Sequence, residues 1–207
     1  METVLPILKS VRKASKSLMM LSDENKQLLL QKLAVIIETN KDLIIAENKK
    51  DLVRMEDDNP KKDRLLLTKE RIQGLADSLR DVAKLPNPSG QELYRKTLEN
   101  GLEVTKITVP IGVVGIIYEA RPNVTIDVAA LCIRSGNAAV LRGGSDADFS
   151  NKCLVSLIHQ AMKGFNLPTE AIQLMPVDRK FVKEILTATD FILSLIHISE
   201  PTRRHLI

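Results

Sequence analysis

The chain has 207 residues, 44% of them hydrophobic and 27% charged, a composition typical of a globular protein that is long enough to bury a core. Its formal net charge is +4 with cations and anions interspersed, and aromatic residues make up only 3% of the sequence. These values argue against a nucleic-acid-binding protein, which would need a basic block or aromatic stacking platforms, but they leave room for a small anionic ligand.

Residues 1–90 are predicted to be helical. From Val4 to Met55 the apolar residues recur at helical spacing with charges on the opposite face, which predicts two or three long helices. Ser22, followed by two acidic residues, is a predicted helix N-cap. A further amphipathic segment from Lys69 to Leu85 begins behind a Thr68 cap and ends at the sequence PNPSG.

Residues 91–109 change period and predict a β-hairpin. Two strand-like runs, Leu93 to Leu98 and Leu102 to Val109, flank the pair Asn100-Gly101. An Asn-Gly pair between two such runs is a strong hairpin signal, because it supplies the positive backbone angles that a tight turn requires. The hairpin would connect the helices to the rest of the chain.

Short apolar strands alternate with helices in the region 110–192. The predicted strands are 113–118, 138–141, 171–175 and 190–193, and the predicted helices are about 124–135, 146–164 and 178–188. Gly136-Asn137 would close the first of these helices, and Ser145 or Asp146 would open the second. Such βαβ alternation predicts an α/β fold with a parallel, Rossmann-like sheet covered by helices.

The last stretch, residues 193–207, differs from the rest of the chain. Two of the three histidines, His197 and His205, fall in it, and Pro201 would break any helix there. The text LSLIHISEPTRRHLI resembles translated sequencing-adapter sequence. We therefore expect a non-native tail that is poorly ordered or only locally helical and makes few contacts with residues 1–192.

Three loops are candidate ligand-binding segments, because open parallel sheets bind ligands beyond the carboxyl ends of their strands. They are 119–123, 142–146 and 176–178. The first reads EARPN and has a plain strand-to-helix connection, with Asn123 as N-cap, as its alternative. The second begins RGGS, where glycines could let backbone N–H groups approach an anion at a helix start; a tight turn that needs positive φ is its alternative.

The usual dinucleotide fingerprint is absent from this region. Gly112 and Gly115 flank or enter the first strand, and no third glycine follows in the turn, so G-x-G-x-x-G is not formed. An acidic ribose-binding residue after the second strand is also missing. Arg142 stands in that place, which favours a 2′-phosphate and therefore NADP.

Four segments of the chain together resemble a known family. They are DLIIAENKKDL, DRLLLTKERIQGLADSLRDVAKLPNP, NGLEVTKITVPIGVVGIIYEARPNVTIDVAALCIRSGNAAVLRGGSDA and LPTEAIQLMPVDR. They are similar to the gamma-glutamyl phosphate reductases, also called glutamate-5-semialdehyde dehydrogenases, of the aldehyde dehydrogenase superfamily, over about residues 1–192. The resemblance implies a cofactor-binding domain, a catalytic domain with a nucleophilic cysteine and a small oligomerisation element. Residues 1–192 would be the amino-terminal part of the first, and thus an incomplete domain.

This resemblance implies an NADPH-dependent oxidoreductase of proline biosynthesis, an amino-acid biosynthetic pathway. A cysteine thiolate would attack gamma-glutamyl 5-phosphate with loss of phosphate, and the thioester would accept hydride from NADPH to give glutamate-5-semialdehyde. The full-length protein would be a homo-oligomer. The alternatives are a related acyl-phosphate or aldehyde dehydrogenase with another substrate, and a non-catalytic nucleotide-binding or oligomerising module.

Carried over residue by residue, the resemblance assigns the site. The loop after the second strand would hold the adenosine ribose of the cofactor through Arg142, Gly143, Gly144 and Ser145. The end of the first strand would run along the cofactor at Tyr118, Glu119, Ala120 and Arg121. Asn123 would be the oxyanion-hole amide that stabilises a tetrahedral intermediate.

The two cysteines, Cys132 and Cys153, are predicted to be buried structural thiols, because both lie in apolar runs. Neither matches the nucleophile of the family, which follows the region of residues 1–192. Their spacing forms neither a disulfide framework nor a zinc site, so no metal is expected. Without a signal peptide or an apolar run of about 18 residues, a cytoplasmic protein without a membrane segment is the expectation.

Overall fold

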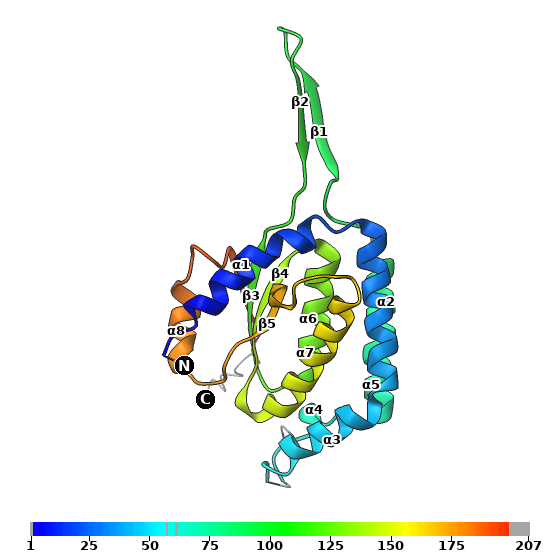
Figure 1. Cartoon of the computed structure of the whole chain (residues 1–207), viewed down its shortest axis with the longest axis vertical. Helices are drawn as coiled ribbons and strands as arrows, with labels where there is room; N and C mark the ends of the chain where they lie inside the picture. The colour runs from blue at the N-terminus through cyan, green and yellow to red at the C-terminus, as the bar shows by residue number, and fades with distance from the viewer. Residues whose placement is uncertain (1, 57, 61, 199–207) are drawn as a thin grey trace, which may run out of the picture.

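The computed structural model describes residues 2–56, 58–60 and 62–198. Helices and a parallel sheet form the body of the molecule, and a two-stranded hairpin projects from one end of it (Figure 1). The predicted α/β architecture, in which helices and a hairpin lead into a parallel Rossmann-like sheet, is confirmed.

The amino-terminal region of the described chain is helical. Its helices are α1 Leu5–Met19, α2 Asp23–Thr39, α3 Lys41–Leu52, α4 Lys62–Leu65 and α5 Lys69–Lys84. Both predicted N-caps are confirmed: the side-chain oxygens of Ser22 and Thr68 each accept a hydrogen bond at 3.2 Å from the backbone N–H three residues later. Helices α2 and α5 pack against each other, and their fully buried side chains Leu33 and Leu79 belong to the hydrophobic core.

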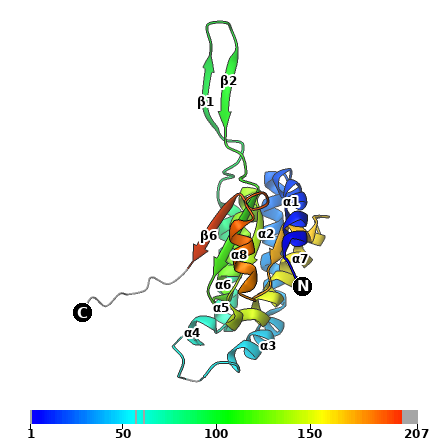
Figure 2. The ribbon, with the colours of Figure 1, turned by 90° about the vertical axis from the view of Figure 1, so that its left-hand side faces the viewer.

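The predicted hairpin is also confirmed. Strands β1 Glu92–Thr97 and β2 Glu103–Ile107 are antiparallel, and Gly101 in the turn has a φ of +84°. Every residue of both strands is exposed, and Figures 1 and 2 show that the hairpin extends away from the body. An isolated two-stranded ribbon is only marginally stable, so this part of the chain contributes little to the core.

The sheet has the strand order β5-β4-β3-β6 and is parallel throughout. Its strands are β3 Val113–Tyr118, β4 Ala138–Arg142, β5 Ile172–Leu174 and β6 Ser194–Ile198. Strand β3 is buried along its whole length, as its run of apolar residues predicts for a central strand of a parallel sheet. The chain moves outward from β3 to β5 and then returns to the other side of β3, so the strand order reverses between β3 and β6.

Helices cover both faces of this sheet. The connecting helices are α6 Pro122–Ser135, α7 Asp148–Lys163 and α8 Lys180–Thr187. Right-handed crossovers put α6 and α7 on one face and α8, whose connection runs in the opposite direction, on the other. Helices α2 and α5 form a further layer over α6 and α7, whereas α1 packs across β3, β4 and β5. A hydrogen bond of 3.1 Å from the Val4 N–H to the Glu184 carboxylate joins the start of α1 to α8.

For residues 193–198, the expectation of poor order or local helix with few contacts to the rest of the chain is wrong, whereas their non-native origin stays a prediction. Residues 190–193 form no strand; instead, Ser194–Ile198 forms β6, which pairs in parallel register with Val114–Tyr118. The physical reason is that β3 lies in the interior, where its second row of backbone N–H and C=O groups needs hydrogen-bond partners. The pairing does not bury the apolar side chains of β6, since Leu195, Ile196 and Ile198 remain 36% to 47% exposed. Residues 199–207 lie outside the described residues.

Candidate functional site

A cleft of about 330 Å³ lies at the carboxyl ends of β3, β4 and β6, at the end of the sheet opposite to the hairpin (Figure 1). This is the crevice where the strand order reverses, which is the usual ligand site of an open α/β sheet. The cleft brings together seven of the eight predicted cofactor-binding residues: Tyr118, Glu119, Ala120, Arg121, Arg142, Gly144 and Ser145. The remaining lining residues come from α4, from β3, from the turn before α7, from the loop after β5 and from β6.

Tyr118 forms the inner wall of this cleft. Its ring is buried, and its hydroxyl shares a 2.7 Å hydrogen bond with Thr125 Oγ1, which donates to Asn151 Oδ1 at 2.7 Å. Burial raises the pKa of Tyr118 to about 12, and the bond to Thr125 only partly offsets this rise. Tyr118 therefore stays neutral and shapes the cleft.

The two glycines of the RGGS loop have a role that the sequence did not predict. Neither Gly143 nor Gly144 has a positive φ, so the alternative of a tight turn with positive φ is wrong. A Cβ atom on Gly144 would lie 3.0 Å from the backbone N of Ala120, and one on Gly143 would overlap the Asn151 side-chain amide. Glycine is needed here because the loops after β3 and β4 approach each other closely, and this approach sets the shape of the cleft.

Gly143→Ala is expected to lower the free energy of unfolding by about 1–3 kcal/mol, because the new methyl group overpacks a buried site against Asn151 and the Tyr118 ring. Urea unfolding of the purified chain measures the change. Gly74→Ala is the matched control: no atom lies within 4 Å of its added methyl group, and the same substitution inside a helix stabilises by roughly 0.5–1 kcal/mol. A Gly143→Ala protein as stable as the original would contradict this explanation of the loop.

The start of α7 differs from its prediction. Neither Ser145 nor Asp146 caps the helix; residues 145–147 form a short 3₁₀ turn, and α7 begins at Asp148. The N–H groups of Phe149 and Ser150, in the first turn of α7, donate to the two carboxylate oxygens of Asp51 at 3.1 and 2.7 Å. An internal carboxylate thus occupies the positive end of the helix that the sequence assigned to a phosphate.

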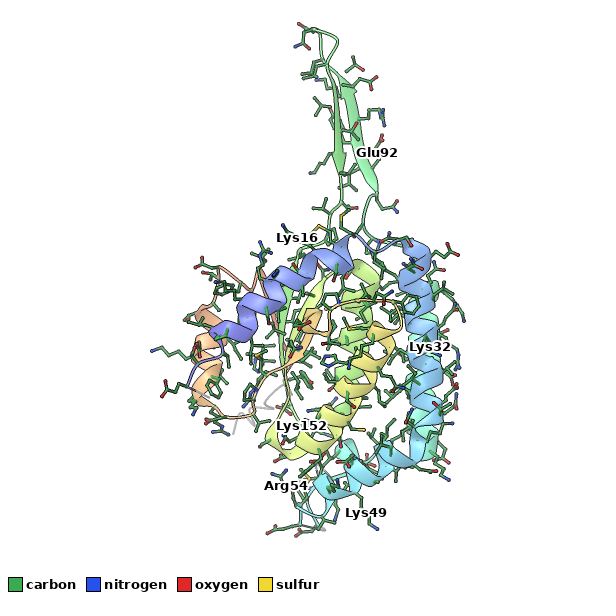
Figure 3. The ribbon with its side chains drawn as sticks, in the orientation of Figure 1. Lys16, Lys32, Lys49, Arg54, Glu92 and Lys152 are labelled. Carbon is green, nitrogen blue, oxygen red and sulfur yellow. The ribbon has the colours of Figure 1, made fainter. Side chains whose placement is uncertain are left out.

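Asp51 is fully buried and comes from the end of α3, almost a hundred residues away in sequence. Its carboxylate also accepts a 2.7 Å hydrogen bond from Ser150 Oγ. Arg54, labelled in Figure 3 beyond the end of α3, places a guanidinium nitrogen 3.7 Å from Asp51 Oδ1. With the helix end already neutralised, the attraction for an anion in the cleft has to come from arginine side chains.

Arg142 lies on the wall of the cleft near Arg179, an arginine that was not predicted from the sequence. The Nη2 of Arg142 donates to the Val177 carbonyl at 2.7 Å, whereas its buried Nε has no hydrogen-bond partner within the described chain. Burial, and secondly the nearby charge of Arg179, lower the pKa of Arg142. Arg179 follows directly on the predicted loop 176–178, so its position after the third strand was the signal that could have identified it. Two guanidinium groups that repel each other in one cleft fit a phosphate bound between them.

Asn123 lies inside the first turn of α6, because the helix begins at Pro122 with Arg121 as its N-cap residue. The alternative of Asn123 as the N-cap is therefore wrong. Its side chain is exposed, hydrogen bonds to Asp127, and lines a second cleft that shares Arg64 and Arg121 with the first. An amide at this place is accessible to a ligand that occupies the second cleft.

The thiols of Cys132 and Cys153 are both buried, in agreement with the prediction. Burial raises the pKa of Cys132 to about 12 and that of Cys153 to about 11. Thiols with such pKa values carry almost no thiolate at neutral pH, so neither has the character of a nucleophile. In the described residues, no group of three or more His, Cys, Asp or Glu side chains could hold a metal ion. No helix in that part of the chain is long and apolar enough to span a membrane.

The comparisons with known proteins agree with the resemblance found in the sequence. Residues 2–205 match the model of the aldehyde dehydrogenase family. The gamma-glutamyl phosphate reductase of Bacteroides fragilis is 48% identical over 183 residues, which are 88% of this chain and 44% of that protein. The enzyme of the same name from Chlorobium phaeobacteroides is 48% identical over 92% of this chain and 46% of its own length. The chain thus spans about half the length of the curated relatives that it matches.

Solved structures lead to the same family. The gamma-glutamyl phosphate reductase of Thermotoga maritima has a TM-score of 0.91 and 32% identity, with 95% of this chain and 49% of that chain covered. The protein of that name from Saccharomyces cerevisiae has a TM-score of 0.86 and 27% identity over 97% of this chain and 52% of its own. The chain belongs to the aldehyde dehydrogenase family, because its sequence matches the family model over residues 2–205 and its fold agrees with that match.

Proposed function

We propose that this chain is the cofactor-binding part of an enzyme of proline biosynthesis that reduces gamma-glutamyl 5-phosphate to glutamate-5-semialdehyde and phosphate with NADPH. The observation that carries the proposal is the cleft at the ends of β3 and β4, where both predicted loops meet. The names of the relatives support the substrate, and membership of the aldehyde dehydrogenase family implies a nicotinamide cofactor. The cytoplasm is the proposed location.

Arg142 and Arg179 would distinguish the two nicotinamide cofactors in this cleft. Their guanidinium groups would receive the 2′-phosphate of NADPH, which relieves their mutual repulsion. Gly144 and Ser145 would lie under the adenosine ribose, while Glu119, Ala120 and Arg121 would line the path toward the reacting end. NADPH, when bound, supplies the hydride for reduction of the acyl group.

Asn123 would donate its side-chain amide to the substrate oxygen that becomes negatively charged during acyl transfer. Its support is its position: it is exposed in the first turn of α6, beside the cleft that adjoins the cofactor cleft. The hydrogen bond to Asp127 would hold the amide in place.

A homo-oligomer of the full-length protein is the further proposal about partners. The projecting hairpin supports it, because apolar side chains such as Leu93, Tyr94 and Ile107 are more than half exposed on it. Apolar surface of this kind is typical of protein interfaces.

Titration of NADPH with the purified chain tests the cofactor proposal directly. We expect saturable binding, followed by the change in NADPH fluorescence, and weaker binding at high salt because a phosphate–arginine contact is screened. NADH is the comparison ligand, because it differs from NADPH only in lacking the 2′-phosphate. If neither NADPH nor NADH shows saturable binding, the assignment of this cleft to the cofactor is overturned.

A further inference from the structure

A second cleft, of about 450 Å³, lies between α5 and the beginning of α6. Its lining includes three guanidinium groups, those of Arg64, Arg71 and Arg121, and two carboxylates, those of Asp63 and Asp127. A small cleft with both charge signs on its walls is suited to a ligand that itself carries both signs, because each charge then meets its opposite.

One arginine of this cleft is held by its own wall. Arg71 donates from Nη2 to Asp63 Oδ1 at 2.8 Å and from Nη1 to the Leu66 carbonyl at 2.9 Å. Its charge is therefore compensated by Asp63. Arg64 and Arg121 line both this cleft and the cofactor cleft, so they stand at the boundary between the two clefts.

Asp127 is the carboxylate of this cleft that lies partly buried. It is half-buried on the inner side of the cleft and accepts a 3.3 Å hydrogen bond from Ser78 Oγ and a further one from Asn123. Burial outweighs these two bonds and raises the pKa of Asp127. A bound ammonium group beside this carboxylate would offset the cost of its burial.

A site for phosphate alone would not contain such a carboxylate, because a buried negative charge repels an anionic ligand. Guanidinium groups and a carboxylate on the walls of one cleft are instead groups that recognise the carboxylate and the ammonium of an α-amino acid. The position of the cleft agrees with this, since Asn123, the proposed donor to the acyl oxygen, lines the same cleft, and the cofactor cleft adjoins it at Arg64 and Arg121.

We propose that the second cleft binds the α-amino acid end of the substrate, with Arg64 and Arg121 receiving the α-carboxylate and Asp127 receiving the α-ammonium group. The inference rests on the proposed function, because it assigns a place to the glutamyl part of the substrate. It makes Asp127 a residue that selects for a free amino group.

Isothermal titration of the purified chain with L-glutamate, glutarate and inorganic phosphate tests this inference. Glutarate has both carboxylates of glutamate and no ammonium, so the pair isolates the contact to Asp127. We expect L-glutamate to bind about tenfold more tightly than glutarate, as one charge-assisted hydrogen bond would provide. Asp127→Asn should remove this preference without weakening glutarate, because glutarate no longer meets a negative charge there, whereas Arg121→Gln should weaken both ligands about tenfold.

Matched substitutions outside the cleft serve as controls. Asp81→Asn removes an exposed carboxylate paired with Lys84, and Arg95→Gln removes an exposed arginine on the hairpin; neither should change binding. Equal affinity for L-glutamate and glutarate, absence of saturable L-glutamate binding, or a preference retained in Asp127→Asn would overturn the inference. NADPH is titrated in the same samples: binding of NADPH without a glutamate preference overturns this inference alone, whereas a glutamate preference without NADPH binding supports it and overturns the cofactor proposal.

Discussion

The chain of residues 1–207 is expected to show no NADP-dependent, phosphate-requiring oxidation of glutamate-5-semialdehyde, even when it binds NADPH. In the oxidation, a thiolate adds to the aldehyde, and the resulting thiohemiacetal gives its hydride to NADP+ to form a thioester that phosphate cleaves. Each of these steps requires an accessible thiolate near the nicotinamide. The cysteines of the chain are Cys132 and Cys153, whose burial raises their pKa values to about 12 and about 11. At pH 7 a pKa of 11 leaves about one thiol in ten thousand ionised.

The assay follows the reduction of NADP+ to NADPH when glutamate-5-semialdehyde and phosphate are supplied. The comparison protein is the same chain extended by the carboxyl-terminal domain of a relative, which is expected to be active. Turnover by residues 1–207 alone, lost on Cys132→Ser or Cys153→Ser, would show that the active site has been misplaced. Turnover in the extended protein alone would support the proposed function over a non-catalytic nucleotide-binding module.

Arg142→Glu is expected to reduce the preference for NADPH over NADH by about ten- to a hundredfold, or to reverse it. The substitution removes one of two guanidinium groups beside the proposed 2′-phosphate position and puts a carboxylate in its place. NADH lacks the 2′-phosphate, so its affinity should change much less. The measurement is the ratio of the two dissociation constants, obtained by fluorescence titration.

Arg95→Glu on the hairpin is the matched control, because it reverses the same charge at an exposed site far from the cleft. It should leave the ratio of the two affinities unchanged. Equal affinity of the unmodified chain for NADPH and NADH would contradict the role of Arg142, as would an unchanged ratio in Arg142→Glu.

Local signals explain what could be predicted from the sequence. The caps at Ser22 and Thr68 depend on bonds to residues three positions away, and strand β3 is a run of apolar residues bounded by turns. The clustering of Tyr118–Arg121 with Arg142–Ser145 followed from topology, since parallel strands place their carboxyl ends at one edge. Whether these residues bind NADPH, and whether Asn123 acts on the substrate, stay predictions.

Contacts over long sequence distances explain what could not be predicted. In the sequence, Asp51 resembles any surface carboxylate at the end of a polar helix, and only the packing of α3 against α7 turns it into a buried cap. In the sequence, Gly143 and Gly144 suggested an anion-binding turn. In the structure, glycine is required there because neighbouring groups lie too close for a Cβ atom. Arg179 and Arg64 lie on segments that gain a common cleft only once the sheet has formed.

The pairing of β6 with β3 also decides how the chain behaves before folding is complete. In a molecule whose β6 has not yet docked, the edge of β3 from Val114 to Tyr118 would present an open row of hydrogen-bonding groups on an entirely apolar strand. Such an edge is a template for a strand from another molecule, and intermolecular pairing there leads to aggregation. Strand β6, whose side chains add little to the core, therefore acts chiefly by pairing this apolar edge within the molecule, and the sheet then ends at β6 itself.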